Sequence, residues 1–319
     1  KPLSEVYDGM FLLLLDDIEG TKNNFSPEKI IALIDNKSKQ RPIWVASSAE
    51  TKRIFDQALE VAAIHRLNTE LVELQTDRVA RRRLATLQQE SERELFTRVD
   101  TVIDDANWEL FWNGGNKKGT KDIGSTLSSL ASYASDKAYY KSPPLFNELI
   151  NRHKPSGVAI KARRMLMSKM ADNQDEPLLG IEKAPPELGI YLSILERNIL
   201  FPVRYNNNDL FSQISKPPEF TDLFDHLTNK LKTTASEKYV SAADIFNTWH
   251  SPPYGMRSGI TPILLFSFIL ENQHQLACYV DDRFVIIFDE VFIERLTKTA
   301  HTIKFRWAAF ENAEGELIG

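Results

Sequence analysis

The sequence has almost no cysteine, no long apolar run and no excess of basic residues. Its 319 residues include one cysteine, Cys278, so an internal disulfide is excluded and a reducing, cytoplasmic location is expected. A thiol without a partner motif is typical of a small buried hydrophobe rather than of a catalytic nucleophile. A net charge of −5 excludes a general polycation, so any contact with nucleic acid requires a local basic patch.

The apolar runs are too short to cross a membrane. Met10–Leu15 and Ile260–Leu270 both fall short of the about 20 residues that span a bilayer, and no signal peptide is found. We therefore expect no membrane partner. The sequence begins at Lys1, and we expect the chain to be a piece of a longer protein, so a motif missing here can lie outside it.

No complete catalytic motif is found. The six histidines are scattered, and a Gly-x-Ser-x-Gly elbow is absent. The loop NGGNKKGTK (113–121) nearly matches a phosphate-binding loop, but its lysine and hydroxyl are swapped, which favours a basic surface loop. MFLLLLDD (10–17) resembles a strand whose last Asp holds Mg²⁺ in NTPases, yet four leucines are as typical of a buried helix. We predict no catalytic, cofactor-binding or metal-binding residue in this chain.

The pattern predicts a mainly α fold with small β elements. No glycine or proline lies between Ala49 and Trp112, which predicts an antiparallel helical hairpin or one long helix within a mostly helical region, 1–105. Further helices are expected at 124–140, 156–170 and 184–198, in a helical domain that covers 106–215. The polar segment 204–218 is the predicted linker.

Residues 216–319 are predicted to form a winged-helix-like domain. Three helices, at about 219–232, 242–250 and 260–273, precede a hairpin that turns at Asp281-Asp282; a helix at 289–300 and the strand TIKFRWAAF follow. The third helix is apolar in nearly every direction, which predicts burial on all sides. It therefore makes a poor DNA-reading helix, because such helices present polar side chains to the bases.

Local groups of basic residues are candidate phosphate contacts, although a solvated helix face balanced by nearby glutamates is the alternative interpretation. Arg78 begins the first of these groups. The residues predicted to contact nucleic acid are Arg81, Arg82 and Arg83 on the first helical region, Lys161 and Arg164 on the helix at 156–170, Arg257 in the PPYGMR turn, and Arg283 in the hairpin.

Three segments carry a resemblance to a known family. NELINR (Asn147–Arg152), LGIEKAPPELGIYLSIL (Leu179–Leu195) and PPYGMRSGITPILL (Pro252–Leu265) resemble the C-terminal half of large prokaryotic P-loop ATPases from phage-defence islands, the BrxC/PglY-type ATPases of BREX systems and related proteins. The resemblance covers roughly 108–310. It implies an ATP and Mg²⁺ site upstream of this segment, and it transfers no catalytic residue because an intact phosphate-binding loop is missing.

Three functions remain open from the sequence. The first is a non-catalytic assembly or DNA-engagement region of a defence ATPase, whose partners would be other defence-system proteins and double-stranded DNA. The second is a stand-alone protein-interaction scaffold. The third is an enzyme whose site assembles from unremarkable residues, which a deep polar pocket with convergent carboxylates would favour.

Overall fold

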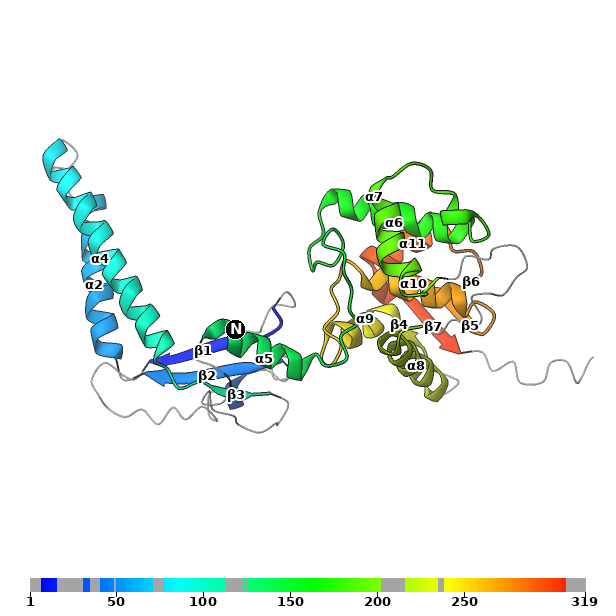
Figure 1. Cartoon of the computed structure of the whole chain (residues 1–319), viewed down its shortest axis with the longest axis horizontal. Coiled ribbons are helices and arrows are strands. Elements are labelled where there is room, and N and C mark those ends of the chain that lie inside the picture. Colours follow the sequence, from blue (N-terminus) through cyan, green and yellow to red (C-terminus); the bar gives the residue numbers. More distant parts are fainter. Residues whose placement is uncertain are drawn as a thin grey trace, which may run out of the picture. The chain divides into compact units, whose positions relative to one another are not determined.

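The protein divides into two compact units, Lys1–Ala138 and Tyr139–Gly319 (Figure 1). The computed structural model describes residues 7–15, 31–34, 41–48, 50–70, 77–112, 123, 126–201, 216–234 and 238–307. These residues are mainly helical and include two small sheets, which confirms the predicted class at that level. The loop 113–121, the pair Asp16-Asp17 and most of the predicted linker 204–218 lie outside the described residues.

Unit 1 is built on a three-stranded sheet. Strand β1 (Met10–Leu15) pairs in parallel with β2 (Ile43–Ser48), which pairs antiparallel with β3 (Glu109–Phe111). MFLLLL, which the sequence left between strand and helix, is therefore a strand. Helix α5 (Leu127–Ala138) adds Leu130 and Ala134 to a core around Trp44 and Trp108. The indole of Trp44 donates to the carbonyl of Leu130 at 3.2 Å, which joins sheet and helix.

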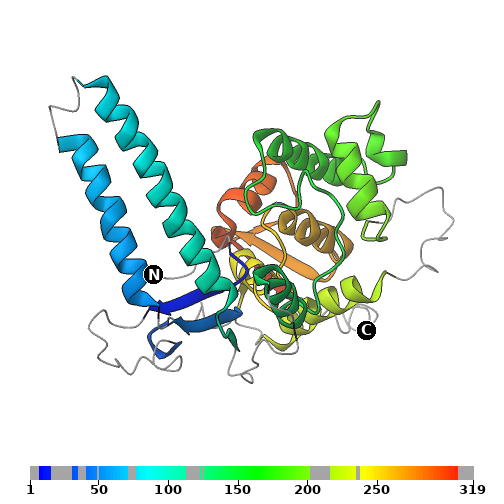
Figure 2. The same cartoon turned by 60° about the vertical axis from the view of Figure 1, so that its left-hand side comes forward.

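A pair of antiparallel helices extends from this sheet as an arm (Figure 2). Helix α2 (Thr51–Glu70) follows β2, and α4 (Arg78–Asp104) returns to β3, beginning at Asp77, whose side chain accepts from two backbone amides. Polar contacts join the two helices: His65 lies 2.8 Å from Glu92, whose pKa is held below its ordinary value by hydrogen bonds from Gln88 and His65. Of the two predicted alternatives, a helical hairpin and one long helix, the arm is the hairpin.

Unit 2 surrounds one hydrophobic core. Its helices are α6 (Gly157–Asp172), α7 (Pro186–Ile190), α8 (Pro218–Thr233), α9 (Ala242–His250), α10 (Thr261–Glu271) and α11 (Glu290–Lys298). Its four-stranded sheet has the order β4-β7-β5-β6, and its strands are β4 (Val240–Ser241), β5 (Leu276–Val280), β6 (Arg283–Val285) and β7 (Ile303–Trp307). The neighbouring strands in this sheet all pair antiparallel.

Helix α10 lies at the centre of that core. Every residue from Thr261 to Leu270 is buried, as its all-round apolar sequence predicted. Ser267 interrupts the apolar residues in the middle of α10, and its buried hydroxyl donates to the carbonyl of Leu200. Among the described residues, no helix has the length and hydropathy needed to span a bilayer.

The units do not follow the predicted three-part division at 105/106 and 215/216. Buried residues on both sides of 215, from Ile150 to Phe305, belong to one cluster. Helix α6, from the predicted middle domain, packs against α10 and α11, from the predicted C-terminal domain. The boundary between units instead falls at 138/139, after the last helix of the first core.

Two predicted elements differ locally. The helix predicted at 184–198 is α7 followed by a π-helical turn, η4 (Tyr191–Glu196), in which Leu192 is 39% exposed. The predicted strand RFVIIF is shorter, because β6 ends at Val285. The turn before it is as predicted: Asp281 and Asp282 both have positive φ, which a two-residue hairpin turn requires.

Candidate functional site

The segments that carry the family resemblance meet in unit 2. Backbone N–H of Gly259 donates to the carbonyl of Arg152 at 2.9 Å, and the N–H of Lys141 donates to Pro253 at 3.1 Å. The side chain of Arg257 bonds to His153. The NELINR segment and the PPYGMRSG turn are therefore a single packed junction.

This junction changes the interpretation of Arg257. The residue was predicted as a DNA contact, but its side chain is half-buried and already bonded to His153. Its first role is consequently to hold two segments together. A substitution here is expected to disturb folding, in contrast to the free surface arginine that the sequence predicted.

Arg163 is a second arginine of the junction, whereas the sequence grouped it with Lys161 and Arg164 as a possible phosphate contact. It is buried on α6, and its guanidinium donates to the carbonyls of Ser258 at 3.3 Å and Gly259 at 3.0 Å. Burial lowers its pKa from the ordinary value. Its two neighbours in the predicted phosphate-contacting group, Lys161 and Arg164, are exposed. The burial of Arg163 could have been predicted from helical spacing, because position 163 lies on the same stripe of α6 as the buried residues Ala159, Leu166 and Met170.

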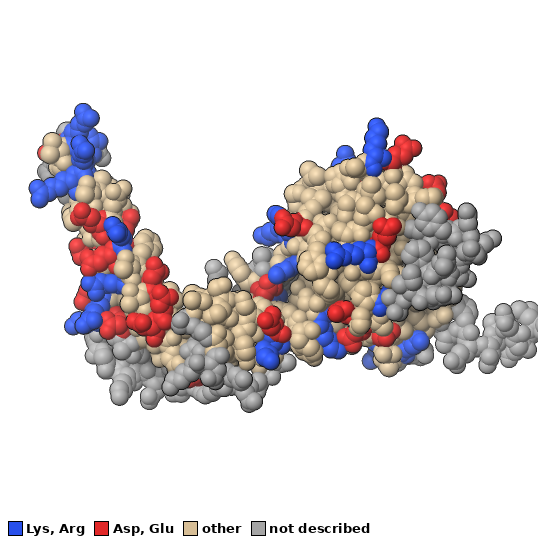
Figure 3. Space-filling view, viewed as in Figure 1, with Lys and Arg blue, Asp and Glu red and all other residues tan. Residues whose placement is uncertain are grey.

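The densest group of exposed basic residues lies at the end of the arm that is remote from the sheet. We call it the arginine tip; it consists of Arg78, Arg81, Arg82 and Arg83, all exposed in the first turns of α4. Figure 3 shows basic side chains gathered at this end and acidic side chains along the shaft of the arm.

The arginine tip differs in its partners from Arg53, Arg66 and Arg98, whereas Arg93 of α4, like the tip, is in none of the ion pairs between described residues. Arg53 pairs with Glu50 at 3.0 Å, Arg66 with Glu70 at 2.8 Å, and Arg98 with Glu94 at 2.8 Å. The ion pairs that join described residues include none of the four tip arginines. The expected balancing by nearby glutamates therefore holds for these three arginines and is not found for the tip among the residues that the structure describes.

Arg283, the last predicted contact, is exposed at the start of β6, directly after the Asp281-Asp282 turn. The neighbouring cations are paired within the protein: Arg295 with Asp281, and Lys304 with Asp282 at 2.7 Å. Arg283 lies in unit 2 and the arginine tip in unit 1, so these two predicted contact regions belong to different units.

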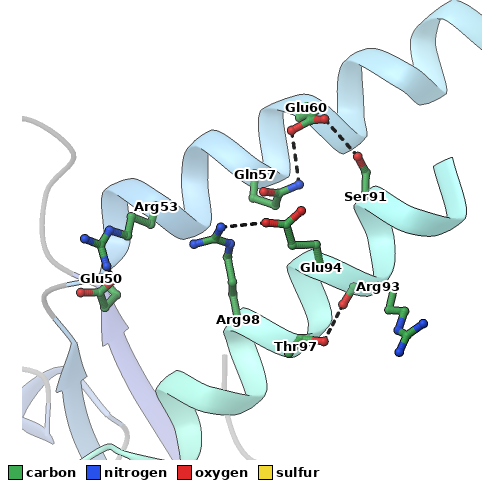
Figure 4. A network of polar contacts seen from close by, with 9 residues as sticks. All are labelled: Glu50, Arg53, Gln57, Glu60, Ser91, Arg93, Glu94, Thr97 and Arg98. Atoms are coloured by element: carbon green, nitrogen blue, oxygen red, sulfur yellow. Dashed lines mark hydrogen bonds and ion pairs between the residues drawn. The ribbon is translucent and has the colours of Figure 1, made fainter. Parts of the chain in front are cut away.

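A polar pocket of about 600 Å³ lies where β2 ends and the arm begins. Figure 4 shows the network beside it, with Arg98 of α4 directed toward Glu94 and toward the first turns of α2. The Nε of Arg98 is buried and has no hydrogen-bond partner among the described residues. The lining of the pocket includes Ser47, Ser48, Glu50, Arg53, Thr101 and Asn107.

The pocket is lined by charged and hydroxyl side chains together with apolar surface from Ile54, Val102 and Ala106. Its two arginines are each paired with a glutamate, Glu50 or Glu94, which leaves little net charge for an anion. Histidine and cysteine are absent from the described lining. Two carboxylates, Glu50 and Asp105, line the pocket, and Glu50 is already paired with Arg53.

Metal and thiol chemistry have no candidate in the described parts of the chain. Groups of three or more His, Cys, Asp or Glu side chains placed to hold a metal ion are absent from these residues. Cys278 is buried in the sheet, and burial raises the pKa of its thiol to about 12, so it stays protonated at neutral pH. This agrees with the predicted role of Cys278 as a small hydrophobe.

Comparison of the chain with protein-family models, with curated proteins and with solved structures finds no significant match in any of the three. The arginine tip, the junction and the polar pocket are thus the features from which function has to be argued.

Proposed function

We propose that the chain is a non-catalytic, DNA-engaging region of a phage-defence ATPase, and that the arm contacts the phosphates of duplex DNA through its arginine tip. The observation that carries the DNA part is the group of four exposed arginines, Arg78 to Arg83, without ion-pair partners among the described residues. The defence-ATPase part rests on the three resembling segments alone. In this proposal, ATP and Mg²⁺ bind upstream of this chain.

The geometry of the tip suits phosphate contacts. The four arginines span about 8 Å along the axis of α4, at 1.5 Å per residue. Each strand of duplex DNA carries one phosphate per about 3.4 Å of the helix axis, so a tip of this length can meet about two phosphates of one strand. Guanidinium groups bind phosphate oxygens through paired hydrogen bonds, which ammonium groups cannot form.

The position of the tip also suits this role. Helix α4 has 27 residues, which gives the arm a length of about 40 Å. The shaft behind the tip carries Asp and Glu side chains among its Lys and Arg (Figure 3), and these carboxylates make the shaft less favourable for phosphates than the tip. Because phosphate contacts carry no sequence information, binding should be independent of DNA sequence.

We infer further that unit 2 contains a winged-helix-like arrangement. The order α8, β4, α9, α10, β5, β7 and the placement of β7 between β4 and β5 support this inference. The wing then consists of β5 and β7, and β6 with α11 is an insertion between them, whereas the sequence assigned the wing to β5 and β6. Since α10 is buried on all sides, this unit would serve packing, and Arg283 is its exposed basic residue near the wing.

The test is binding of the chain to a fluorescent random-sequence duplex over a series of salt concentrations. The Arg81→Gln/Arg82→Gln variant should bind more weakly, and the slope of log K against log[salt] should fall by about 0.9 for each phosphate that the variant no longer neutralises. The matched control is Arg53→Gln/Arg98→Gln, which removes the same charge from the same arm but from arginines already paired with glutamates.

The proposal predicts that the control variant keeps the affinity and the slope of the unaltered chain. An unaltered chain that does not bind the duplex at low salt would overturn the DNA part. Equal weakening in the tip and control variants would also overturn it, because binding would then depend on net charge rather than on the tip. The DNA affinity of Arg283→Gln, measured in the same series, shows whether the wing contributes to binding in addition to the arginine tip.

A further inference from the structure

The seam of the arm buries polar side chains beside the apolar Ile64, while other apolar side chains remain on the outside. Gln57 of α2 and Ser91 of α4 are buried between the helices. In contrast, Phe55 is 39% exposed, Leu59 51% and Leu67 45%. Apolar side chains that remain outside a two-helix arm indicate a surface that another chain covers.

These exposed residues form one band. Phe55, Leu59, Ala63 and Leu67 follow one another at intervals of four, which places them along the same side of α2, and Ala63 is exposed like the other three. We call this band the outer face of α2. It extends about 18 Å along the helix axis.

We propose that the outer face of α2 binds the outer face of a second copy of this chain, antiparallel, about a two-fold axis at Val61. In such an interface each contact occurs twice, because the same surface is used by both copies. An axis at Val61 places Phe55 against Leu67 of the second copy and Leu59 against Ala63, so each apolar residue of the face meets another apolar residue.

The charges that flank the band select this orientation. With the axis at Val61, Lys52 faces Glu70 of the second copy and Asp56 faces Arg66, and all four side chains are exposed. Every flanking charge therefore meets the opposite charge. A parallel, in-register pairing would instead place each charge on itself, which is repulsive.

The flanking charges form a chain of contacts across the interface. Glu70 already holds Arg66 at 2.8 Å on its own helix. The second copy adds Asp56 on one side of this ion pair and Lys52 on the other. The result is a four-residue network in which carboxylates and cations alternate, which contributes more than isolated surface ion pairs do.

The first experiment measures the oligomeric state by sedimentation equilibrium. We expect a dimer whose dissociation constant rises at least tenfold in Leu59→Ser. Leu87→Ser is the matched control, since Leu87 is a leucine of α4 with 45% exposure that lies off the outer face. A monomeric unaltered chain, or equal effects of the two substitutions, would overturn the proposal.

The second experiment tests the orientation. Chains carrying Leu59→Cys, mixed with chains carrying Ala63→Cys, should form a disulfide-linked dimer on mild oxidation, because the proposed axis places these two positions opposite each other. Lys52→Cys alone should not, because nine residues on either side of the axis separate the two thiols by about 27 Å. Cross-linking of Lys52→Cys would indicate a parallel pair and would contradict the proposed axis. The native Cys278 is buried and does not compete.

The third experiment is charge reversal with rescue. Lys52→Glu should weaken the dimer several-fold. Because Glu70→Lys also breaks the ion pair with Arg66, Lys52→Glu/Glu70→Lys should dimerise more tightly than Glu70→Lys alone, since the charges at 52 and 70 are again opposite. Circular dichroism of each variant confirms that the arm is folded. A double variant that dimerises no more tightly than Glu70→Lys would mean that the two positions do not meet. This inference does not depend on DNA binding, and its readouts contain no DNA.

Discussion

Replacing Leu265 with alanine tests whether α10 is the centre of unit 2. Leu265 is 0% exposed on a helix that is buried on every side, so the cavity left by the removed atoms cannot be filled from solvent. Leucine-to-alanine changes in such cores cost about 2–5 kcal/mol, and we expect a loss of about 3 kcal/mol or more. For a unit of this size that corresponds to a fall in Tm of about 6–12 °C.

The assay is hydrogen exchange of the full chain, followed by mass spectrometry, in combination with a thermal scan. Exchange in peptides of α10 should accelerate in Leu265→Ala, whereas peptides from the sheet of unit 1 provide an internal reference. Leu192→Ala is the control, because Leu192 is 39% exposed and should cost less than about 1 kcal/mol. Leu265→Asp should leave unit 2 unfolded, since it buries an unpaired carboxylate.

Two results would refute this reasoning. If Leu265→Ala and Leu192→Ala shift the transition equally, then α10 is not the buried centre of the unit. If Leu265→Asp remains soluble and melts cooperatively with protected α10 amides, the helix has a solvent-facing side that the structure lacks.

Three further predictions concern unit 2. Gly259→Ala should destabilise it, as measured by thermal unfolding, because an added Cβ would overlap a backbone carbonyl, whereas Gly189→Ala meets nothing within 4 Å and should stabilise α7 by about 0.5–1 kcal/mol. Arg163→Met should lower stability by about 2–4 kcal/mol in denaturant titrations, since it leaves two carbonyls without a donor, while Arg164→Met should stay within about 0.5 kcal/mol. Cys278 should resist alkylation at pH 8 until the unit unfolds; because its pKa rises from 9.0 unfolded to about 12 folded, its ionisation should leave stability unchanged below pH 9 and reduce it as the pH rises from 9 toward 12.

Local signals in the sequence predicted most of the helices. The sequence places helix starts at Ser156 and Ser241, and the side chains of both residues cap α6 and α9. The burial of α10 was predictable as well, because a helix that is apolar in every direction has no side that water can solvate. In these cases the residues that decide the structure lie within a few positions of one another.

Structure that depends on distant contacts was not predictable. The parallel pairing of β1 and β2 joins segments about thirty residues apart, as in Met10 opposite Ile43, and alternation along either strand does not specify its partner. The burial of Arg163 follows from carbonyls 95 and 96 positions away in sequence. The sequence shows the arginine tip as a basic run, but only the structure shows that Glu70 and Glu94 pair with other arginines of the arm.

The place of the arm in the chain has a consequence for how the protein can be altered. The arm leaves the sheet after β2 and returns at β3, and these two strands are antiparallel neighbours, with Val45 opposite Glu109. In topological terms the whole arm is the connection of a β-hairpin, enlarged from a few residues to two long helices. The sheet closes whatever the length of that connection, so the part of the arm beyond Ile103 can be shortened or lengthened by whole helical repeats. Ile103 itself has to stay, because it packs against the core of Trp44 and Trp108 and its carbonyl accepts from the Trp108 indole at 3.1 Å. The arm is therefore a spacer whose reach can vary without a change in the unit that carries it.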